Sequence, residues 1–360
     1  MTPPILYVAM TNHGFGHTTR TTAVVNLIQQ FCPEVVVILA TTAPRWLLER
    51  QMSGHFIHRP RALDIGVVQG DSFQMDLGAT LTQLQRIQAT ARSVIASEVQ
   101  FLRQNRVKLV LADIPPLAVA IAHGAGVPCW MASNFGWDFI YRPWGGDFVG
   151  IADWIAEQFS HCDRLFRLPF HESMSAFPQI ADVGLTGSDP EGDLEALRSH
   201  YALDQPKERT VLLTFGGLGL EQVPYETVQQ FPDWQFITFD RHAPRLDNLR
   251  VVTDHRHRPV DLMPLCDRIL AKPGYGTFAE ACRVGTAVCT LPREGFAEAP
   301  LLLAGIHNHA YHQDIDPALF FQGNWEFLHA PVQAPRLPDS LPSNGNEAIA
   351  QAVVDYLQSA

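Results

Sequence analysis

The segment at 272–281 constrains the fold of this chain more than any other, because it places glycines between a predicted strand and a predicted helix. An apolar run at 268–271 predicts the strand, and residues 277–284 predict the helix. Gly274 and Gly276 lie in the turn between them. The first turn of a helix leaves backbone N–H groups unpaired, and glycines let a phosphate approach those groups closely. The segment therefore predicts either an anion site or an ordinary capped turn.

Side chains around this turn add groups that a nucleotide could use. Thr277 adds a hydroxyl at the start of the predicted helix, and Tyr275 lies between the two glycines. Glu280, three residues after Thr277, could accept hydrogen bonds from vicinal hydroxyls such as those of a ribose. With Gly274 and Gly276, these residues are candidates for binding the diphosphate end of a nucleotide.

A second glycine loop has the same arrangement. The apolar run at 210–215 predicts a strand that leads directly into Gly216 and Gly217. Two such loops suggest that one diphosphate is held between them. Neither loop is a P-loop, and neither completes the pattern Gly-x-Gly-x-x-Gly. A nicotinamide enzyme is disfavoured for that reason, and also because no acidic residue ends the second predicted strand.

A third glycine loop, near the N-terminus, carries a histidine. The buried strand predicted at 5–10 is followed by Gly14, Gly16 and His17, and residues 21–30 have helical spacing. Ligands bind at the carboxyl ends of strands in open α/β sheets, and a histidine side chain can accept a proton near neutral pH. We therefore predict that His17 is a general base, with the glycines allowing close approach of a substrate.

Other polar residues follow predicted strands in the same half of the chain. Asp113 ends one of these strands, and Asn134, Trp137 and Asp138 follow the next. We take these four residues as candidates for binding an acceptor, together with His13, for which a hydrogen bond that orients the loop is the simpler role. For Trp137, packing in the core is an alternative to stacking on a sugar.

Strand and helix signals alternate along the chain, which predicts α/β structure with parallel sheets. A length of 360 residues is enough for two domains. Polar segments at 186–193 and 204–208 indicate the two ends of a linker. We expect a first domain at 1–188, a linker at 189–207, a second domain at 208–342 and a final helical segment at 343–360.

Composition excludes several classes of function. The formal net charge of −11 and the absence of a basic stripe argue against a nucleic-acid partner. The six cysteines are scattered singly, which is typical of core residues in a reducing cytoplasm. No window approaches the roughly 18 apolar residues that a membrane helix needs, although peripheral contact with a membrane stays possible.

Five motifs together resemble the glycosyltransferase-like N-terminal region of plant L-arabinokinases. They are Asn12-His13-Gly14-Phe15-Gly16-His17, Ser133-Asn134-Phe135-Gly136-Trp137, Ser160-His161-Cys162, Arg167-Leu168-Pro169 and Gly274-Tyr275-Gly276-Thr277. More distantly the chain is similar to GT-B glycosyltransferases of the MurG and UDP-glycosyltransferase type. Its first motif also resembles that of the nucleotide-sugar hydrolase of pseudaminic acid synthesis.

The resemblance implies a GT-B architecture, in which two Rossmann-like βαβ domains face each other across a cleft. The N-terminal domain would bind the acceptor, the C-terminal domain would bind a nucleotide-sugar donor that usually carries UDP, and the final helix would cross back towards the first domain. By motif position, His17 corresponds to the catalytic histidine, Glu280 to the ribose-binding acid, and Glu298 lies near the residues that hold the donor sugar. No sugar-kinase domain follows residue 360, so arabinokinase activity is not expected.

These features predict a cytoplasmic glycosyltransferase that moves a sugar from a UDP-sugar to the hydroxyl of a small-molecule, glycan or lipid acceptor. We expect no metal and no cofactor besides the UDP-sugar, and we interpret the His-rich stretches at 254–258 and 307–312 as surface loops. Hydrolysis of the nucleotide sugar and its non-catalytic binding are alternatives. The sequence does not define the donor sugar, the acceptor, the anomeric outcome or the oligomeric state.

Overall fold

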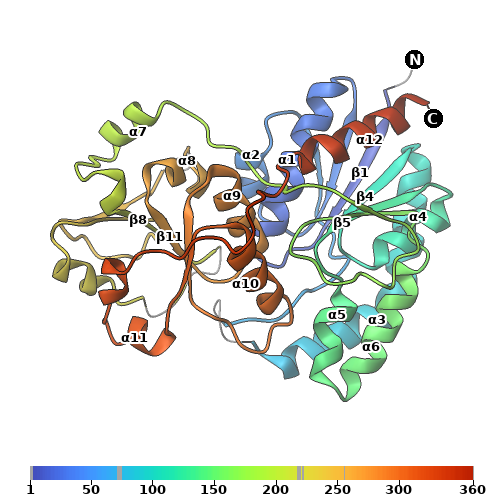
Figure 1. Ribbon diagram of the computed structural model, residues 1–360. Helices are drawn as coiled ribbons and strands as arrows, with labels where there is room; N and C mark the ends of the chain where they lie inside the picture. The colour runs from blue at the N-terminus through green and yellow to red at the C-terminus, as the bar shows by residue number, and fades with distance from the viewer. Residues whose placement is uncertain (1–2, 71–74, 217–219, 221–222, 255, 360) are drawn as a thin grey trace. The chain divides into compact units, whose positions relative to one another are not determined.

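The computed structural model describes residues 3–70, 75–216, 220, 223–254 and 256–359. The chain forms two compact units, each with its own parallel sheet (Figure 1). The N-terminal unit combines Met1–Gly70 and Met75–Gly187 with the chain end at Pro342–Ala360, and the C-terminal unit is built around Ser188–Leu341. No helix in the described part of the chain is long and apolar enough to cross a membrane.

The N-terminal unit has a seven-stranded parallel sheet in the order β3-β2-β1-β4-β5-β6-β7. The strands are β1 (Ile5–Met10), β2 (Val36–Ala40), β3 (Ile57–Arg59), β4 (Leu109–Asp113), β5 (Cys129–Ser133), β6 (Arg164–Arg167) and β7 (Ile180–Asp182). The helices are α1 (Gly16–Phe31), α2 (Arg45–Gln51), α3 (Leu77–Gln104), α4 (Leu117–Ala125), α5 (Trp137–Tyr141), α6 (Asp147–Phe159) and α12 (Gly345–Ser359). The central strands are apolar and buried, as expected for a parallel sheet with helices on its faces.

The C-terminal unit has a six-stranded parallel sheet in the order β10-β9-β8-β11-β12-β13. The strands are β8 (Thr210–Thr214), β9 (Gln235–Thr238), β10 (Leu249–Val251), β11 (Arg268–Ala271), β12 (Ala287–Thr290) and β13 (His312–Asp314). The helices are α7 (Leu194–His200), α8 (Pro259–Leu262), α9 (Tyr275–Val284), α10 (Glu298–His309) and α11 (Pro317–Phe321). Part of the core lies where the rings of Phe320 and Trp325 stack beside Phe236.

The predicted strands agree with the observed ones to within two residues, whereas several helices begin earlier than predicted. We expected a helix at 21–30, but α1 begins at Gly16, so His17 belongs to the first helical turn instead of the loop before it. The Thr-rich start of α1 has low helix propensity. It is stabilised locally because Thr19 and Thr22 donate their hydroxyls to carbonyls four residues earlier.

The last helix, α12, packs against α1 within the N-terminal unit (Figure 1). Gly345 allows this approach, because a Cβ atom there would lie 2.1 Å from the carbonyl oxygen of Gly184. Asn346 then accepts a hydrogen bond from the amide of Gly187 at 3.2 Å and donates one to its carbonyl at 2.7 Å. The end of the chain is thus fixed to the segment that follows β7.

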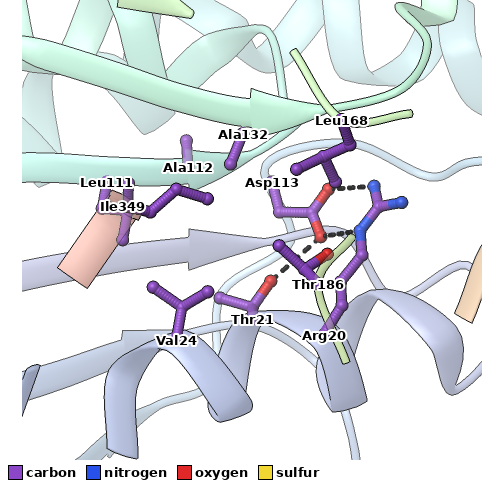
Figure 2. Close-up of a pocket in the computed structure, with 10 residues that line it drawn as sticks. All are labelled: Arg20, Thr21, Val24, Leu111, Ala112, Asp113, Ala132, Leu168, Thr186 and Ile349. Atoms are coloured by element: carbon purple, nitrogen blue, oxygen red, sulfur yellow. Dashed lines mark hydrogen bonds and ion pairs between the residues drawn. The ribbon is translucent and has the colours of Figure 1, made fainter. Parts of the chain in front are cut away.

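A small cavity lies under α12, between α1 and the ends of β4 and β5 (Figure 2). Its volume of about 20 Å³ is room for about one water molecule. The lining is apolar along Val24, Leu111 and Ile349, and becomes polar where Arg20 and Asp113 meet. The cavity is far too small for a nucleotide sugar, and its polar end belongs to the network around His17.

Candidate active site

The N-terminal unit gathers its polar residues where the strand order reverses. The chain runs from β1 outwards through β2 and β3, and then returns to place β4 on the other side of β1. Met10 is paired with Asp113, and the amide of Thr11 donates to the carbonyl of Asp113 at 2.9 Å. Ligands bind at such switch points in open α/β sheets. His17 reaches this point from the first turn of α1.

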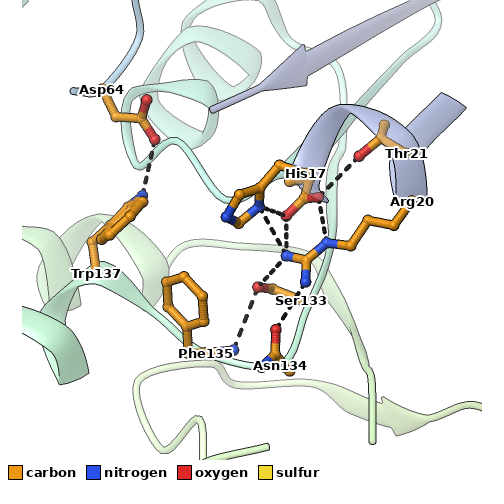
Figure 3. A network of polar contacts seen from close by, with 9 residues as sticks. His17, Arg20, Thr21, Asp64, Ser133, Asn134, Phe135 and Trp137 are labelled. Atoms are coloured by element: carbon orange, nitrogen blue, oxygen red, sulfur yellow. Dashed lines mark hydrogen bonds and ion pairs between the residues drawn. The ribbon is translucent and has the colours of Figure 1, made fainter. Parts of the chain in front are cut away.

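The centre of this site is a buried ion pair between Arg20 and Asp113 (Figure 2). Figure 3 shows Arg20 among its other partners, His17, Ser133 and Asn134. Nε of Arg20 donates to Oδ2 of Asp113 at 2.7 Å, and Nη2 donates to Oδ1 at 2.5 Å. The hydroxyl of Thr21 donates to the same carboxylate at 2.9 Å, and Nη1 of Arg20 donates to Asn134 at 2.9 Å. Burial alone would raise the pKa of Asp113, but Arg20 and His17 hold it well below its usual range.

The hydrogen-bond pattern determines which nitrogen of His17 carries the proton. Nδ1 lies 3.0 Å from Oδ1 of Asp113 and 3.0 Å from Nη2 of Arg20. Nη2 has two protons, which it donates to Asp113 and to the hydroxyl of Ser133. When both protons are used in this way, Nδ1 of His17 donates to the carboxylate. In the neutral ring, Nε2 then carries the lone pair, as a general base requires.

Aromatic and backbone contacts hold the ring of His17 and the loop before it. The ring meets Phe135 edge-on at 5.8 Å and lies 6.4 Å from Trp137. Trp137 is fully buried, and its indole N–H donates to Asp64 at 2.9 Å. His13 accepts a hydrogen bond from the Val67 amide at 3.2 Å, which is the orienting role that the sequence suggested for it.

The proposed acceptor residues therefore differ in accessibility. Asp113, Asn134 and Trp137 are each 2% exposed or less, so their contacts are with the protein around His17. Asp138, in the first turn of α5, is partly exposed. Its pKa is raised to about 6, mainly by the part of the side chain that is buried and to a smaller extent by repulsion from Glu172. Of these four candidates, Asp138 is the one that is not fully buried, although its Oδ1 atom is.

The glycines of the first motif have different positions. Gly14 has a φ of +72° and open space where a Cβ would lie, so its backbone conformation, rather than crowding, favours glycine. Gly16 is the first residue of α1 and is exposed. The loop can therefore turn sharply and still present the start of α1 to solvent.

The C-terminal unit places its glycine loops at its own switch point. The chain runs from β8 outwards through β9 and β10, and then returns to place β11 beside β8, with Thr214 paired to Ala271. Gly216 follows β8 and has a φ of +79°, and Gly274 follows β11 as the residue before α9. The two loops are therefore neighbours, as expected. Gly217 lies outside the described residues.

Lys272 joins the two loops and is a residue that the sequence analysis did not select. A Cβ atom on Gly216 would lie 3.3 Å from Cε and 3.9 Å from Nζ of Lys272. The lysine side chain therefore crosses from the end of β11 to the loop after β8. Its position between a strand and Pro273 could have indicated this role.

The remaining donor candidates lie on α9 and α10. Tyr275 and Gly276 are buried in the first turn of α9, while Thr277 is partly exposed. Glu280 accepts a hydrogen bond from the Ser188 amide at 3.2 Å, and burial raises its pKa to about 7. Glu298 is 7% exposed at the start of α10.

An acidic pair of the Asp-x-Asp type occurs at Asp314 and Asp316, and both residues have structural roles. Asp314 lies 3.0 Å from Nε2 of His307, and Asp316 accepts the amide of Ala318 at the start of α11. These carboxylates therefore hold local structure at the end of β13, and we assign them no part in binding a donor.

Comparisons with known proteins agree with this architecture. The chain is 28% identical over 315 residues to an L-arabinokinase of Arabidopsis thaliana, and the match covers 81% of the chain but only 28% of that protein. No family model matches the chain.

Solved structures match over nearly the whole chain. A UDP-glucosyltransferase from Polygonum tinctorium capable of glucosylating indoxyl is similar with a TM-score of 0.62 at 12% identity, covering all of both chains. A transferase from Siraitia grosvenorii in complex with UDP is similar with a TM-score of 0.57 at 13% identity, covering 98% of this chain and all of the other. At such identities the likeness establishes the fold. The chain, with its two Rossmann-like parallel sheets, has the GT-B fold of these glycosyltransferases.

Proposed function

We propose that this protein transfers a sugar from a UDP-sugar to an acceptor hydroxyl, with His17 as the general base. The observation that carries the proposal is the 3.0 Å contact between Nδ1 of His17 and Asp113, which favours the tautomer with Nε2 as the basic nitrogen. The fold of transferases that use UDP, and the two glycine loops at one switch point, support a UDP-sugar as the donor.

In the proposed reaction, Nε2 of His17 takes the proton of an acceptor hydroxyl while its oxygen attacks the anomeric carbon of the donor. The bond between that carbon and the diphosphate breaks, and UDP leaves with the electron pair. The imidazolium that forms is stabilised by Asp113, whose carboxylate stays ionised. Arg20 and Thr21 fix that carboxylate from the other side, so the proton position is set before a substrate binds.

On the donor side, the first amides of α9 and the ammonium of Lys272 would stabilise the negative charge that develops on the leaving diphosphate. Glu280 would bind the ribose, and Glu298 would bind hydroxyls of the donor sugar. The amides of α9 and the ammonium of Lys272 supply the positive charge that a metal provides in other phosphate sites, so we propose that transfer needs no metal.

The setting of the reaction is part of the proposal. All six cysteines are free and five of them are buried, which supports a reducing compartment such as the cytoplasm.

Asp138, as the least buried of the four acceptor candidates, is our first choice for a residue that contacts the acceptor.

The test separates transfer from hydrolysis and from binding alone. The purified protein is incubated with a panel of UDP-sugars, with and without a mixture of alcohol and glycan acceptors, and chromatography measures UDP, free sugar and glycosylated product. Transfer predicts UDP and product in equal amounts only when an acceptor is present. Equal amounts of UDP and free sugar without any acceptor would establish hydrolysis instead. UDP binding with no turnover under any condition would leave a binding module.

A further inference from the structure

Two histidines and an aspartate from separate parts of the C-terminal unit lie close together away from its glycine loops. His200 is the last residue of α7, and Asp254 and His257 lie between β10 and α8. One ligand atom from each of the three residues lies within 4.8 Å of the other two. His200 and Asp254 are 54 positions apart in the sequence, so no short sequence motif indicates this arrangement.

The distances between these atoms are near those of a metal site. Nε2 of His200 lies 3.7 Å from Oδ2 of Asp254, and Nδ1 of His257 lies 3.4 Å from Oδ1. Two ligands on a tetrahedral zinc ion, at bond lengths of roughly 2.0–2.1 Å, are about 3.4 Å apart. The side chain of His200 is 58% exposed, which leaves room for it to change rotamer when an ion binds.

Asp254 is held in position for this role. Its carboxylate accepts the amides of Arg256 at 2.8 Å and His257 at 3.2 Å, and the hydroxyl of Tyr201 at 2.7 Å. The carboxylate is therefore held in one orientation before an ion binds.

We propose that His200, Asp254 and His257 bind a divalent transition-metal ion. Two imidazole nitrogens and one carboxylate oxygen form a donor set that suits zinc and similar ions better than magnesium or calcium. The side chains of Asp254 and His257 are 31% and 24% exposed, so an ion can enter and a water molecule can complete the coordination. On binding, Nδ1 of His257 would exchange its contact with the hydroxyl of Tyr201, 2.6 Å away, for the ion, and that hydroxyl would remain bonded to Asp254.

The ion would have a structural role. It would join the end of α7 to the loop that follows β10, an edge strand of the sheet. Strand β9 separates β10 from β8, so the cluster is set apart from the turn between β11 and α9. This site is independent of the proposed transfer reaction, which uses other residues, and it changes our expectation from the sequence that 254–258 form a surface loop without a metal.

The experiment uses the full chain without an affinity tag, freed of metals by a chelator and then dialysed. Cobalt chloride is added in steps while the visible absorption of the bound ion is recorded, and zinc chloride is titrated by calorimetry. We expect one equivalent of either ion to bind, with His200→Ala and His257→Ala each weakening affinity at least tenfold. His200→Ala should leave the fold intact, because the side chain is exposed.

Two control variants test whether histidines elsewhere are responsible. His161→Ala removes an exposed histidine that also lies beside a carboxylate, 3.2 Å from Glu157, and His309→Ala alters the His-rich helix α10. Both should bind cobalt as the unmodified chain does. The proposal is overturned if the chain takes up neither ion, if His200→Ala binds them with unchanged affinity, or if the binding is lost in one of the controls instead.

Discussion

The strand order reverses in the same way in both sheets, but different chemical groups lie at the two switch points. In the N-terminal unit, polar side chains that are almost completely buried, Arg20, Asp113 and His17, are bonded to one another. In the C-terminal unit, the corresponding position holds glycines, the backbone amides of α9 and one lysine. Proton transfer needs a base in one tautomer and one orientation, which a network of side chains can fix. Binding a diphosphate needs several donors at close range, which a backbone without Cβ atoms provides.

The contrast also predicts where each unit is vulnerable. The N-terminal network depends on a buried charge pair. Removing one partner leaves the other charge buried without compensation, which lowers the free energy of unfolding. The C-terminal turn depends on space and on partial charges, so most single changes there should weaken binding and leave folding intact. Four variants test this contrast, and we expect their effects to decrease from His17→Ala through Asp113→Ala and Glu280→Gln to Lys272→Ala.

The largest effect should come from His17→Ala. Loss of a general base typically lowers turnover by roughly 10²–10⁴, or about 3–5 kcal/mol in the activation barrier. Because the base and the diphosphate loops belong to different sheets, UDP should still raise the melting temperature of the variant as it does for the unmodified chain. Steady-state kinetics and thermal-shift measurements, with His161→Ala as the control, check both parts. Near-normal turnover of His17→Ala would refute the base assignment.

The next effect should be on stability. Asp113→Ala leaves the guanidinium of Arg20 buried without its carboxylate, which should lower the free energy of unfolding by about 3–5 kcal/mol. Asp182→Ala is the matched control, because it also removes a carboxylate that binds an arginine, Arg167 at 2.6 Å, but its side chain is 65% exposed. That variant should lose at most about 1 kcal/mol. Urea unfolding measures both, and equal losses would mean that burial of the first pair does not matter.

Glu280 should make stability fall with rising pH. Its folded-state pKa of about 7 is above the usual value of a glutamate, so the folded protein binds more protons than the unfolded chain between roughly pH 4 and 7. Stability from this group is present at low pH and is lost as pH rises through that window. At about 1.4 kcal/mol per unit, Glu280→Gln should remove a decline of roughly 2–3 kcal/mol. Unfolding midpoints at pH 4.5 and pH 8, with exposed Glu326→Gln for comparison, test this; parallel curves for Glu280→Gln and the unmodified chain would contradict it.

The smallest effect should come from Lys272→Ala. Loss of one charge-assisted contact to a phosphate should weaken UDP binding about tenfold, or about 1.4 kcal/mol, and leave uridine binding unchanged. Calorimetry with UDP and with uridine separates the two, and exposed Lys207→Ala serves as the control. If UDP binds the Lys272 variant with full affinity, the lysine only packs on Gly216.

Short sequence patterns correctly predicted the features that depend on neighbouring residues. The strand at 268–271 and the glycine turn after it depend on residues next to one another in sequence, and both predictions agree with the structure. Four short strands, β3, β6, β7 and β13, were not predicted, because none of them contains the run of three apolar residues that marks β8 and β11.

The network around His17 depends on contacts between distant residues, and the sequence analysis found only part of it. Asp113 was selected, but as an acceptor ligand, and Arg20 was not selected at all. One signal was present: His17, Arg20 and Thr21 are spaced by three and four residues and so share a face of α1. That they all meet Asp113, more than 90 residues away, follows only from the pairing of β1 with β4.

The position of α12 has a consequence for how the protein is made. The N-terminal unit is interrupted in sequence by the whole C-terminal unit, and α1, which also contacts α2, is covered by α12 only once residues 345–359 are made. During synthesis, a ribosome at about 5–20 residues per second would finish the C-terminal sheet before the first unit could close. Until then, α1 and the backbone around Gly184 would remain uncovered, so nascent chains are the form of this protein that should most need a chaperone.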